Sequence, residues 1–150
     1  MTLYVDGDAF PNLLKSVLHR AIERLALKTV VVSNKQIYMG DSKHISHIIV
    51  DEGPDEADHR IVELVQENDL VITADIPLAD RVLSKMAHVI GHRGELFSSD
   101  NIKDRLAIRD LMHDIRESGE FGKGPAPFSP KDVHKFINQL DRFLTQQMSR

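Results

Sequence analysis

The sequence predicts an α/β protein with a mainly parallel central sheet. Between residues 1 and 94, short apolar runs alternate with segments in which apolar residues recur at helical spacing. Their order is strand, helix, strand, strand, helix, strand, helix, strand, and strands connected by helices are typical of a parallel sheet. The run Thr29-Val30-Val31-Val32-Ser33 shows no polar alternation, as expected of a strand that is buried on both faces.

Five short strands and three connecting helices are predicted in this region. The strands lie at residues 3–5, 29–33, 47–50, 70–73 and 88–90. The first helix begins at Pro11, which suits the first helical position, and continues to Leu25 with a broad apolar face. The second follows Asp55, its predicted N-cap. The third is indicated by inward residues Leu78, Val82, Leu83 and Met86. For the polar segment 34–46, the sequence is compatible with either a short helix or a loop.

Past Gly94 no further strand is predicted, and the chain continues as helices. Ser98 or Ser99 caps a helix with four apolar residues on one predicted side, Ile102, Leu106, Leu111 and Ile115. A Gly/Pro-rich loop follows at 118–128, and a last helix starts at Ser129-Pro130. We expect a single domain over residues 1–150, with an α/β core at 1–94 and a helical C-terminal extension at 95–150.

Composition excludes several classes of function. The net charge of −4 argues against a purely electrostatic nucleic-acid coat. The chain has no Cys, which removes thiol catalysis, disulfides and Cys-ligated zinc. No apolar run approaches the ~18 residues of a membrane span, and the chain reaches Asp6 at once, unlike a signal peptide. We expect a soluble cytoplasmic protein.

Acidic residues follow three of the predicted strands. Asp6 and Asp8 follow the first strand, Asp55, Glu56 and Asp58 start the helix after the third, and Asp75 and Asp80 follow the fourth. Because the carboxyl ends of parallel strands meet at one edge of a sheet, we expect these acids to converge. Asp55 and Asp58 would share a helix face. Asp75 can join Asp80 only from the turn before the helix, because five helical residues rotate the chain by about 500°.

Carboxylates gathered in this way repel one another unless cations lie between them. Oxygen ligands in a chain without Cys favour Mg²⁺ or Mn²⁺. Such ions position a phosphodiester, activate a water and stabilise the leaving oxygen. The candidate metal ligands are Asp6, Asp8, Asp55, Glu56, Asp58, Asp75 and Asp80. The candidate catalytic residues are Asp6, Asp58, Asp75 and Asp80.

Simpler interpretations of these acids stay open. Asp and Glu are common at helix N-termini, because they accept backbone N–H bonds and complement the helix dipole. Asp8, Asp75 and the acids at 55–58 can therefore be caps alone, whereas Asp6 ends an apolar strand and has no such duty. The letters of Asp55-Glu56-Ala57-Asp58 match the helicase DEAD box, but the phosphate-binding loop GxxxxGK[ST] is absent.

Asp6-Gly7-Asp8 also resembles the DxD motif of haloacid-dehalogenase-type phosphatases. In this interpretation Asp6 is a nucleophile that forms an aspartyl-phosphate, Asp8 is the general acid and Ser33 is the strand-two hydroxyl. Phe10 stands where that motif usually has Thr or Val, and no Lys is clearly placed for its third motif. The acids at 55–58 would also have no role.

Polar and basic residues near the same sheet edge are candidates for contacts with nucleic acid. Arg93 follows the fifth strand, and Thr73 ends the fourth strand beside Asp75. The full candidate set is Thr73, His92, Arg93, Lys103, Arg105 and Arg109. A solvated helix face is the simpler explanation for the basic residues at 103–109.

Five segments, in this order, resemble the YaiI/YqxD family of uncharacterised bacterial proteins. They are Val5-Asp6-Gly7-Asp8-Ala9-Phe10-Pro11, Asp55-Glu56-Ala57-Asp58, Thr73-Ala74-Asp75-Ile76-Pro77-Leu78-Ala79, Arg93-Gly94-Glu95-Leu96, and Gly124 to Ser129. Family members are similar, more distantly, to PIN/NYN-type nuclease domains. The resemblance implies a three-layer α/β/α sandwich, a metal site at the strand ends, and RNA or another nucleic acid as substrate. By position, Asp6, one acid within 55–58, Asp75 and Asp80 match the four PIN acids.

Residues and resemblance together favour a nuclease dependent on Mg²⁺ or Mn²⁺ that acts on RNA or single-stranded nucleic acid. The alternatives are an aspartyl-phosphate phosphatase and a nucleic-acid-binding protein without catalysis. The sequence leaves open whether the chain forms a homodimer.

Overall fold

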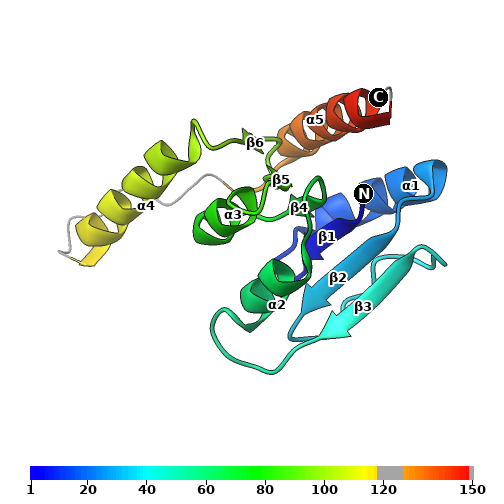
Figure 1. Ribbon diagram of the computed structural model, residues 1–150, viewed down its shortest axis with the longest axis horizontal. Coiled ribbons are helices and arrows are strands. Elements are labelled where there is room, and N and C mark those ends of the chain that lie inside the picture. Colours follow the sequence, from blue (N-terminus) through cyan, green and yellow to red (C-terminus); the bar gives the residue numbers. More distant parts are fainter. Residues whose placement is uncertain (118–126, 149–150) are drawn as a thin grey trace.

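The computed structural model describes residues 1–117 and 127–148, which form one six-stranded sheet and five helices (Figure 1). The strands are β1 (Leu3–Asp6), β2 (Thr29–Ser33), β3 (Ile45–Ile49), β4 (Leu70–Ile72), β5 (His88–Ile90) and β6 (Leu96–Phe97). The helices are α1 (Asn12–Leu25), α2 (Glu56–Leu64), α3 (Ile76–Leu83), α4 (Ile102–Glu117) and α5 (Pro130–Met148). The predicted α/β class and the order of elements up to β5 are confirmed.

The strand order is β3-β2-β1-β4-β5-β6. The first five strands are parallel, whereas β6 is antiparallel to β5. β2 and β3 lie on one side of β1, and β4, β5 and β6 lie on its other side. The order in which the chain adds strands to the sheet therefore reverses between β1 and β4. In open α/β sheets, ligands bind outside the carboxyl ends of the strands at such a reversal point.

Helices cover both faces of this sheet and complete a three-layer α/β/α sandwich (Figure 1). α1 and α5 lie on one face, while α2, α3 and the first turn of α4 lie on the other. Buried side chains include Leu14, Leu18, Phe136 and Leu140 at the first face, and Ile61, Leu78, Val82 and Ile102 at the second. Because both faces are covered, β1, β2 and β4 are buried at nearly every position instead of in alternation.

The expectation that no strand follows Gly94 is wrong, because Leu96 and Phe97 form β6. The chain turns back after β5 through two backbone hydrogen bonds, from Gly91 N–H to the Glu95 carbonyl (2.8 Å) and from Gly94 N–H to the Gly91 carbonyl (3.1 Å). A strand of two residues is too short to show a period of two in sequence. Residues 34–44 form a loop and not a helix, and β3 begins two residues earlier than predicted.

The predicted apolar side of α4 is also wrong. Ile102 is buried against α3, but Leu111 is 59% exposed. Leu106 and Leu111 are five residues apart, which corresponds to about 500° on a helix, so they point to different sides. Figure 1 shows α4 extending away from the sheet beyond its first turns. Most of the loop predicted at 118–128 lies outside the described residues.

α5 begins at Pro130, as predicted, and docks closely on the turn after β5. Asp132 accepts hydrogen bonds from the backbone N–H and the hydroxyl of Ser129, at 3.0 and 3.3 Å. Gly94 has a φ of 87°, and a Cβ at this position would lie 2.5 Å from the Lys135 carbonyl oxygen. Neither α5 nor any other helix in the described part of the chain is long and apolar enough to cross a membrane.

Candidate metal centre

Asp6 ends β1 at the reversal point of the sheet and is only 8% exposed. Thr73 comes directly after the neighbouring strand β4, and its hydroxyl donates a hydrogen bond of 2.8 Å to Asp6 Oδ2. The same hydroxyl oxygen accepts the Asp75 backbone N–H at 3.0 Å. The fully buried Thr73 side chain therefore holds together the ends of two strands. This role differs from the nucleic-acid contact that the sequence suggested for Thr73.

Asp75 lies in the turn before α3. This is the position that the sequence predicted as necessary for Asp75 to reach the other acids. Asp75 is the N-cap of α3, and its Oδ1 accepts the Leu78 backbone N–H at 3.0 Å. Pro77 in the first turn favours the start of the helix at this point. Asp75 is therefore both a cap and a member of the acidic cluster, so the two interpretations from sequence are compatible.

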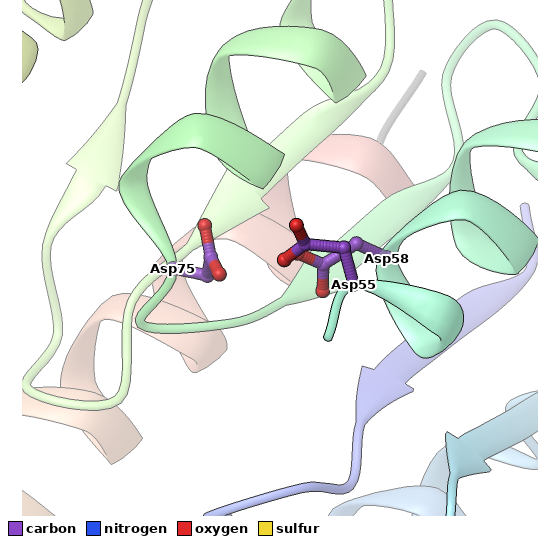
Figure 2. A group of neighbouring side chains, drawn as sticks. All are labelled: Asp55, Asp58 and Asp75. Atoms are coloured by element: carbon purple, nitrogen blue, oxygen red, sulfur yellow. The ribbon is translucent and has the colours of Figure 1, made fainter. Parts of the chain in front are cut away.

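Asp55 and Asp58 reach the cluster from the start of α2. Asp55 occupies the N-cap position with a left-handed backbone (φ 67°), and its side chain caps none of the described backbone N–H groups. Oxygen atoms of Asp55, Asp58 and Asp75 all lie within 4.8 Å of one another. Figure 2 shows the three carboxylates gathered between the start of α2 and the turn before α3.

These acids line a cleft of about 280 Å³ at the carboxyl ends of the strands. Among the described residues, its lining contains six acids and no lysine or arginine. The lining residues are Asp6, Asp8, Ala9, Gly53, Asp55, Glu56, Ala57, Asp58, Ala74, Asp75 and His92. A cleft whose charged side chains are all negative repels an anion unless a cation is also present.

The cluster resists full ionisation. Burial raises the pKa of Asp6 to about 6; the Thr73 hydrogen bond opposes this shift, and the charges of Asp75 and Asp8 add to it. Burial likewise raises the pKa of Asp58 to about 7, helped by the negative charges of Asp75 and Asp6. A divalent cation would remove this repulsion, and carboxylate oxygens are the ligands that Mg²⁺ and Mn²⁺ prefer. The donor set therefore fits such an ion.

Asp8 and Asp80 have other partners. Asp8 lines the cleft, and its Oδ1 accepts the Asn34 backbone N–H at 3.0 Å. It does not cap α1, whose N-cap position is taken by Pro11. Asp80 forms an ion pair of 3.0 Å with Lys103 of α4 and does not line the cleft. The structure thus brings together every predicted metal ligand except Asp80.

The four predicted nucleic-acid contacts from Arg93 to Arg109 also lie outside the cleft, each with an acidic partner. Arg93 pairs with Asp132 at 2.9 Å, and its guanidinium lies over the Phe128 ring. The other pairs are Arg105 with Glu95 at 2.6 Å, Lys103 with Asp80 at 3.0 Å, and Arg109 with Asp110 at 3.8 Å. Their proposed contacts with nucleic acid stay predictions.

His92, the remaining predicted nucleic-acid contact, does line the cleft. Its ring is buried, with its centroid 5.3 Å from that of Phe10 and the two planes nearly perpendicular. Burial, assisted by the charge of Arg93, lowers the pKa of His92 to about 4 and keeps the ring neutral. Within the described residues, Nε2 has no hydrogen-bond partner.

Sequence reasoning missed the backbone groups that shape this site. Asn34 contributes its N–H to Asp8, and Gly53, with a φ of 148°, precedes Asp55 in the loop that turns into α2. The Gly53-Pro54 pair was a visible signal of a turn. The hydrogen bonds of Thr73 had a weaker signal, a hydroxyl two residues before an N-cap Asp.

Sequence similarity shows which family the chain belongs to. The model of the YaiI/YqxD family, described as uncharacterised, matches residues 4–146. The chain belongs to this family. A UPF0178 protein from Sulfurovum sp. (strain NBC37-1) is 64% identical over 146 residues, which cover 97% of this chain and 99% of the relative. One from Sulfurimonas denitrificans is 63% identical over 148 residues, covering 99% and 98%. No solved structure matches the chain.

The YaiI/YqxD match confirms the resemblance carried by the five sequence segments. All residues that line the cleft fall between Asp6 and His92, inside the matched range. The more distant relative from Janthinobacterium sp. (strain Marseille), 47% identical over 150 residues, also aligns along the whole chain. None of these family names carries an activity, so a function must be inferred from the site itself.

Proposed function

We propose that this protein is a divalent-metal-dependent nuclease that hydrolyses phosphodiester bonds in RNA or other single-stranded nucleic acid. The observation that carries this proposal is the convergence of Asp55, Asp58 and Asp75 within 4.8 Å, in the same cleft as the buried Asp6. The acids come from separate segments and meet where open α/β sheets bind their ligands. The more distant resemblance to PIN/NYN-type nuclease domains that the sequence suggests agrees with this function.

Asp55, Asp58 and Asp75 would hold Mg²⁺ or Mn²⁺, since both ions prefer oxygen ligands. Asp8 and Glu56 line the same cleft and offer further carboxylate oxygens. When bound, such an ion supplies Lewis acidity toward a phosphoryl oxygen and lowers the pKa of a coordinated water. The cleft-lining side chains alone would repel the phosphodiester, so the proposal requires that activity disappear in a chelator.

Asp6 has a separate role in the proposed reaction. Its Oδ2 accepts the Thr73 hydrogen bond, which fixes the orientation of the carboxylate. A carboxylate held in one orientation at the cleft is suited to act as a general base. Asp6 would therefore accept a proton from the attacking water at Oδ1, the oxygen that does not accept the Thr73 hydrogen bond.

The test is hydrolysis of mixed RNA and single-stranded DNA in Mn²⁺ or Mg²⁺ by the wild type, Asp6→Asn and Asp75→Asn. We expect products with the wild type, none in EDTA, and rates lower by roughly 10²-fold or more in both variants. Asp80→Asn is the matched control, because it makes the same chemical change outside the cleft. Hydrolysis that survives in Asp6→Asn and Asp75→Asn would overturn the mechanism. Binding without cleavage at saturating metal would leave a nucleic-acid-binding protein.

The aspartyl-phosphate alternative finds less support. Ser33, its strand-two hydroxyl, is fully buried, and its Oγ donates to the Lys35 carbonyl at 2.5 Å. The lysine that such a phosphatase needs is missing from the described residues that line the cleft. Turnover of small phosphate monoesters, together with trapping of BeF₃⁻ on Asp6, would favour the phosphatase instead.

A further inference from the structure

The loop after β2 is attached to the wall of the acidic cleft. Asn34 donates its backbone N–H to Asp8 Oδ1 at 3.0 Å, and the Ser33 hydroxyl donates to the Lys35 carbonyl. Ile37 packs at Gly7, where an added Cβ would lie 3.1 Å from Ile37 Cδ1. Because Gly7 separates Asp6 from Asp8, this contact fixes the loop next to Asp6 at the end of β1 and Asp8 just after it.

Tyr38 follows Ile37 and points outward from this fixed backbone. Ile37 and Met39 on either side of it pack against the core, whereas Tyr38 is 70% exposed. This is the highest exposure of any large hydrophobic side chain in the described ranges. A solitary exposed apolar residue is common in proteins, so exposure alone gives Tyr38 no role. Its position in a loop attached to the cleft is what matters.

The backbone is also held on the far side of Tyr38. Gly40, with a φ of 106°, lies against the His19 ring, and His19 Nε2 is 2.8 Å from the Asp41 carbonyl oxygen. A hydrogen bond with the Asp41 side chain raises the pKa of the Tyr38 hydroxyl. Contacts on both sides therefore fix the backbone that carries Tyr38 before any ligand binds, and a preorganised backbone loses little entropy on binding.

We propose that Tyr38 is a stacking platform for a base of single-stranded nucleic acid whose phosphate lies in the acidic cleft. This inference rests on the proposed nuclease function and specifies its substrate. Tyr38 is four positions after Asn34, which is bonded to Asp8 at the cleft, so their backbones lie within about 14 Å of each other. An exposed tyrosine face stacks on any base, and single strands offer unstacked bases that a duplex does not.

The substrate that follows is single-stranded and only weakly restricted in sequence. Stacking uses the face of the base and reads none of its hydrogen-bonding edges. The neighbouring Lys35 is exposed and adds a positive charge to a loop that leads away from the acids. A duplex of the same length should bind more weakly, because its bases are already stacked on one another.

The composition of the chain allows a direct measurement. It has no Trp and two Tyr, and the other tyrosine, Tyr4, is buried with its hydroxyl bonded to the Leu64 carbonyl. Quenching of tyrosine fluorescence on titration with a 12-nucleotide single-stranded phosphorothioate DNA in Mn²⁺ therefore reports stacking on Tyr38. A Tyr4→Phe background removes the remaining signal. Dissociation constants of the non-fluorescent variants come from anisotropy of the same oligonucleotide carrying a dye.

We expect quenching in Tyr4→Phe, and a dissociation constant about five- to 150-fold higher in Tyr38→Ala, the range that base–aromatic stacking gives. Tyr38→Phe keeps the ring and should bind within twofold of the wild type. Met86→Ala is the matched control. Met86 was predicted to face inward, but it lies beyond the end of α3 and is 68% exposed. It precedes β5 and so lies at the amino ends of the strands, opposite the cleft. Absence of quenching, or equal affinity in Tyr38→Ala, overturns the inference even if hydrolysis persists. Quenching without hydrolysis refutes the nuclease proposal and leaves this site standing.

Discussion

Thr73 and Asp6, 67 residues apart in sequence, are joined by a buried hydrogen bond of 2.8 Å from the Thr73 hydroxyl to Asp6 Oδ2. This bond connects the carboxyl ends of β4 and β1 at the point where the building of the sheet reverses direction. Thr73 also accepts the N–H of Asp75, so one hydroxyl bonds to two of the acids that line the cleft. The cleft therefore depends on a residue that does not line it.

Thr73→Val should destabilise the protein and loosen the acidic cluster. Valine has the shape of threonine but leaves Asp6 Oδ2 without its donor and the Asp75 N–H without its acceptor. Leaving such buried groups unsatisfied costs about 1–3 kcal/mol. Urea denaturation at pH 7 measures the loss. Thr73→Ser retains the hydroxyl and should recover most of this stability; equal stability of Thr73→Val and wild type would contradict the account.

The pKa of Asp6 predicts how stability changes with pH. In the folded protein this pKa is about 6, above the ordinary 3.8, so the unfolded chain releases its proton first as pH rises. Asp6 therefore costs no stability below about pH 4; its cost grows between about pH 4 and pH 6 and is constant at higher pH. At one pKa unit per 1.36 kcal/mol, the cost at pH 8 is on the order of 2–3 kcal/mol.

Asp6→Asn should remove this cost without changing the size of the side chain. Relative to wild type, the variant should gain stability between pH 4 and pH 8 in EDTA, as measured by urea denaturation at both values. Asp58→Asn should change in the same direction, because the pKa of Asp58 is also raised. Asp80→Asn, outside the cleft, serves as the control. A pH-independent difference between Asp6→Asn and wild type would show that Asp6 is ionised normally.

Gly94→Ala should weaken the docking of α5. The φ of 87° disfavours alanine, and its Cβ would lie 2.5 Å from the Lys135 carbonyl oxygen, so the helix must shift. We expect a loss of about 1–3 kcal/mol, typical of overpacking, in urea denaturation. Gly53→Ala has a comparable backbone cost (φ 148°), but its Cβ would meet only the flexible Glu56 side chain. If the two variants lose the same stability, the collision with α5 is not important.

Much of the sheet could be predicted because its strands are buried on both faces and read as continuous apolar runs. β1 and β4 were visible in this way, and their positions placed Asp6 and Asp75 at one edge of the sheet. The position of Asp75 before α3 was indicated by Pro77. These features depend on short-range sequence signals, and the structure places them as expected.

Other features depend on contacts that sequence does not display. Asp80 follows the same strand as Asp75, but it lies within α3, away from the cleft, and pairs with Lys103 of α4. Whether Asp55 caps α2 or faces the cluster is decided by its left-handed backbone. Leu111 is apolar like Ile102, but it is exposed and Ile102 is buried, because the helical period puts the two residues on different sides of α4.

The central claim is that Asp55, Asp58 and Asp75 hold a divalent cation, and calorimetric titration of Mn²⁺ tests it most directly. Asparagine at Asp75 retains an N-cap for α3, and Asp58→Asn keeps the shape of the side chain, so both variants should fold. We expect saturable Mn²⁺ binding to the wild type and to Asp80→Asn, and affinity at least tenfold weaker in Asp58→Asn and Asp75→Asn. Absence of binding to the wild type, or equal affinity in all four proteins, would contradict the account.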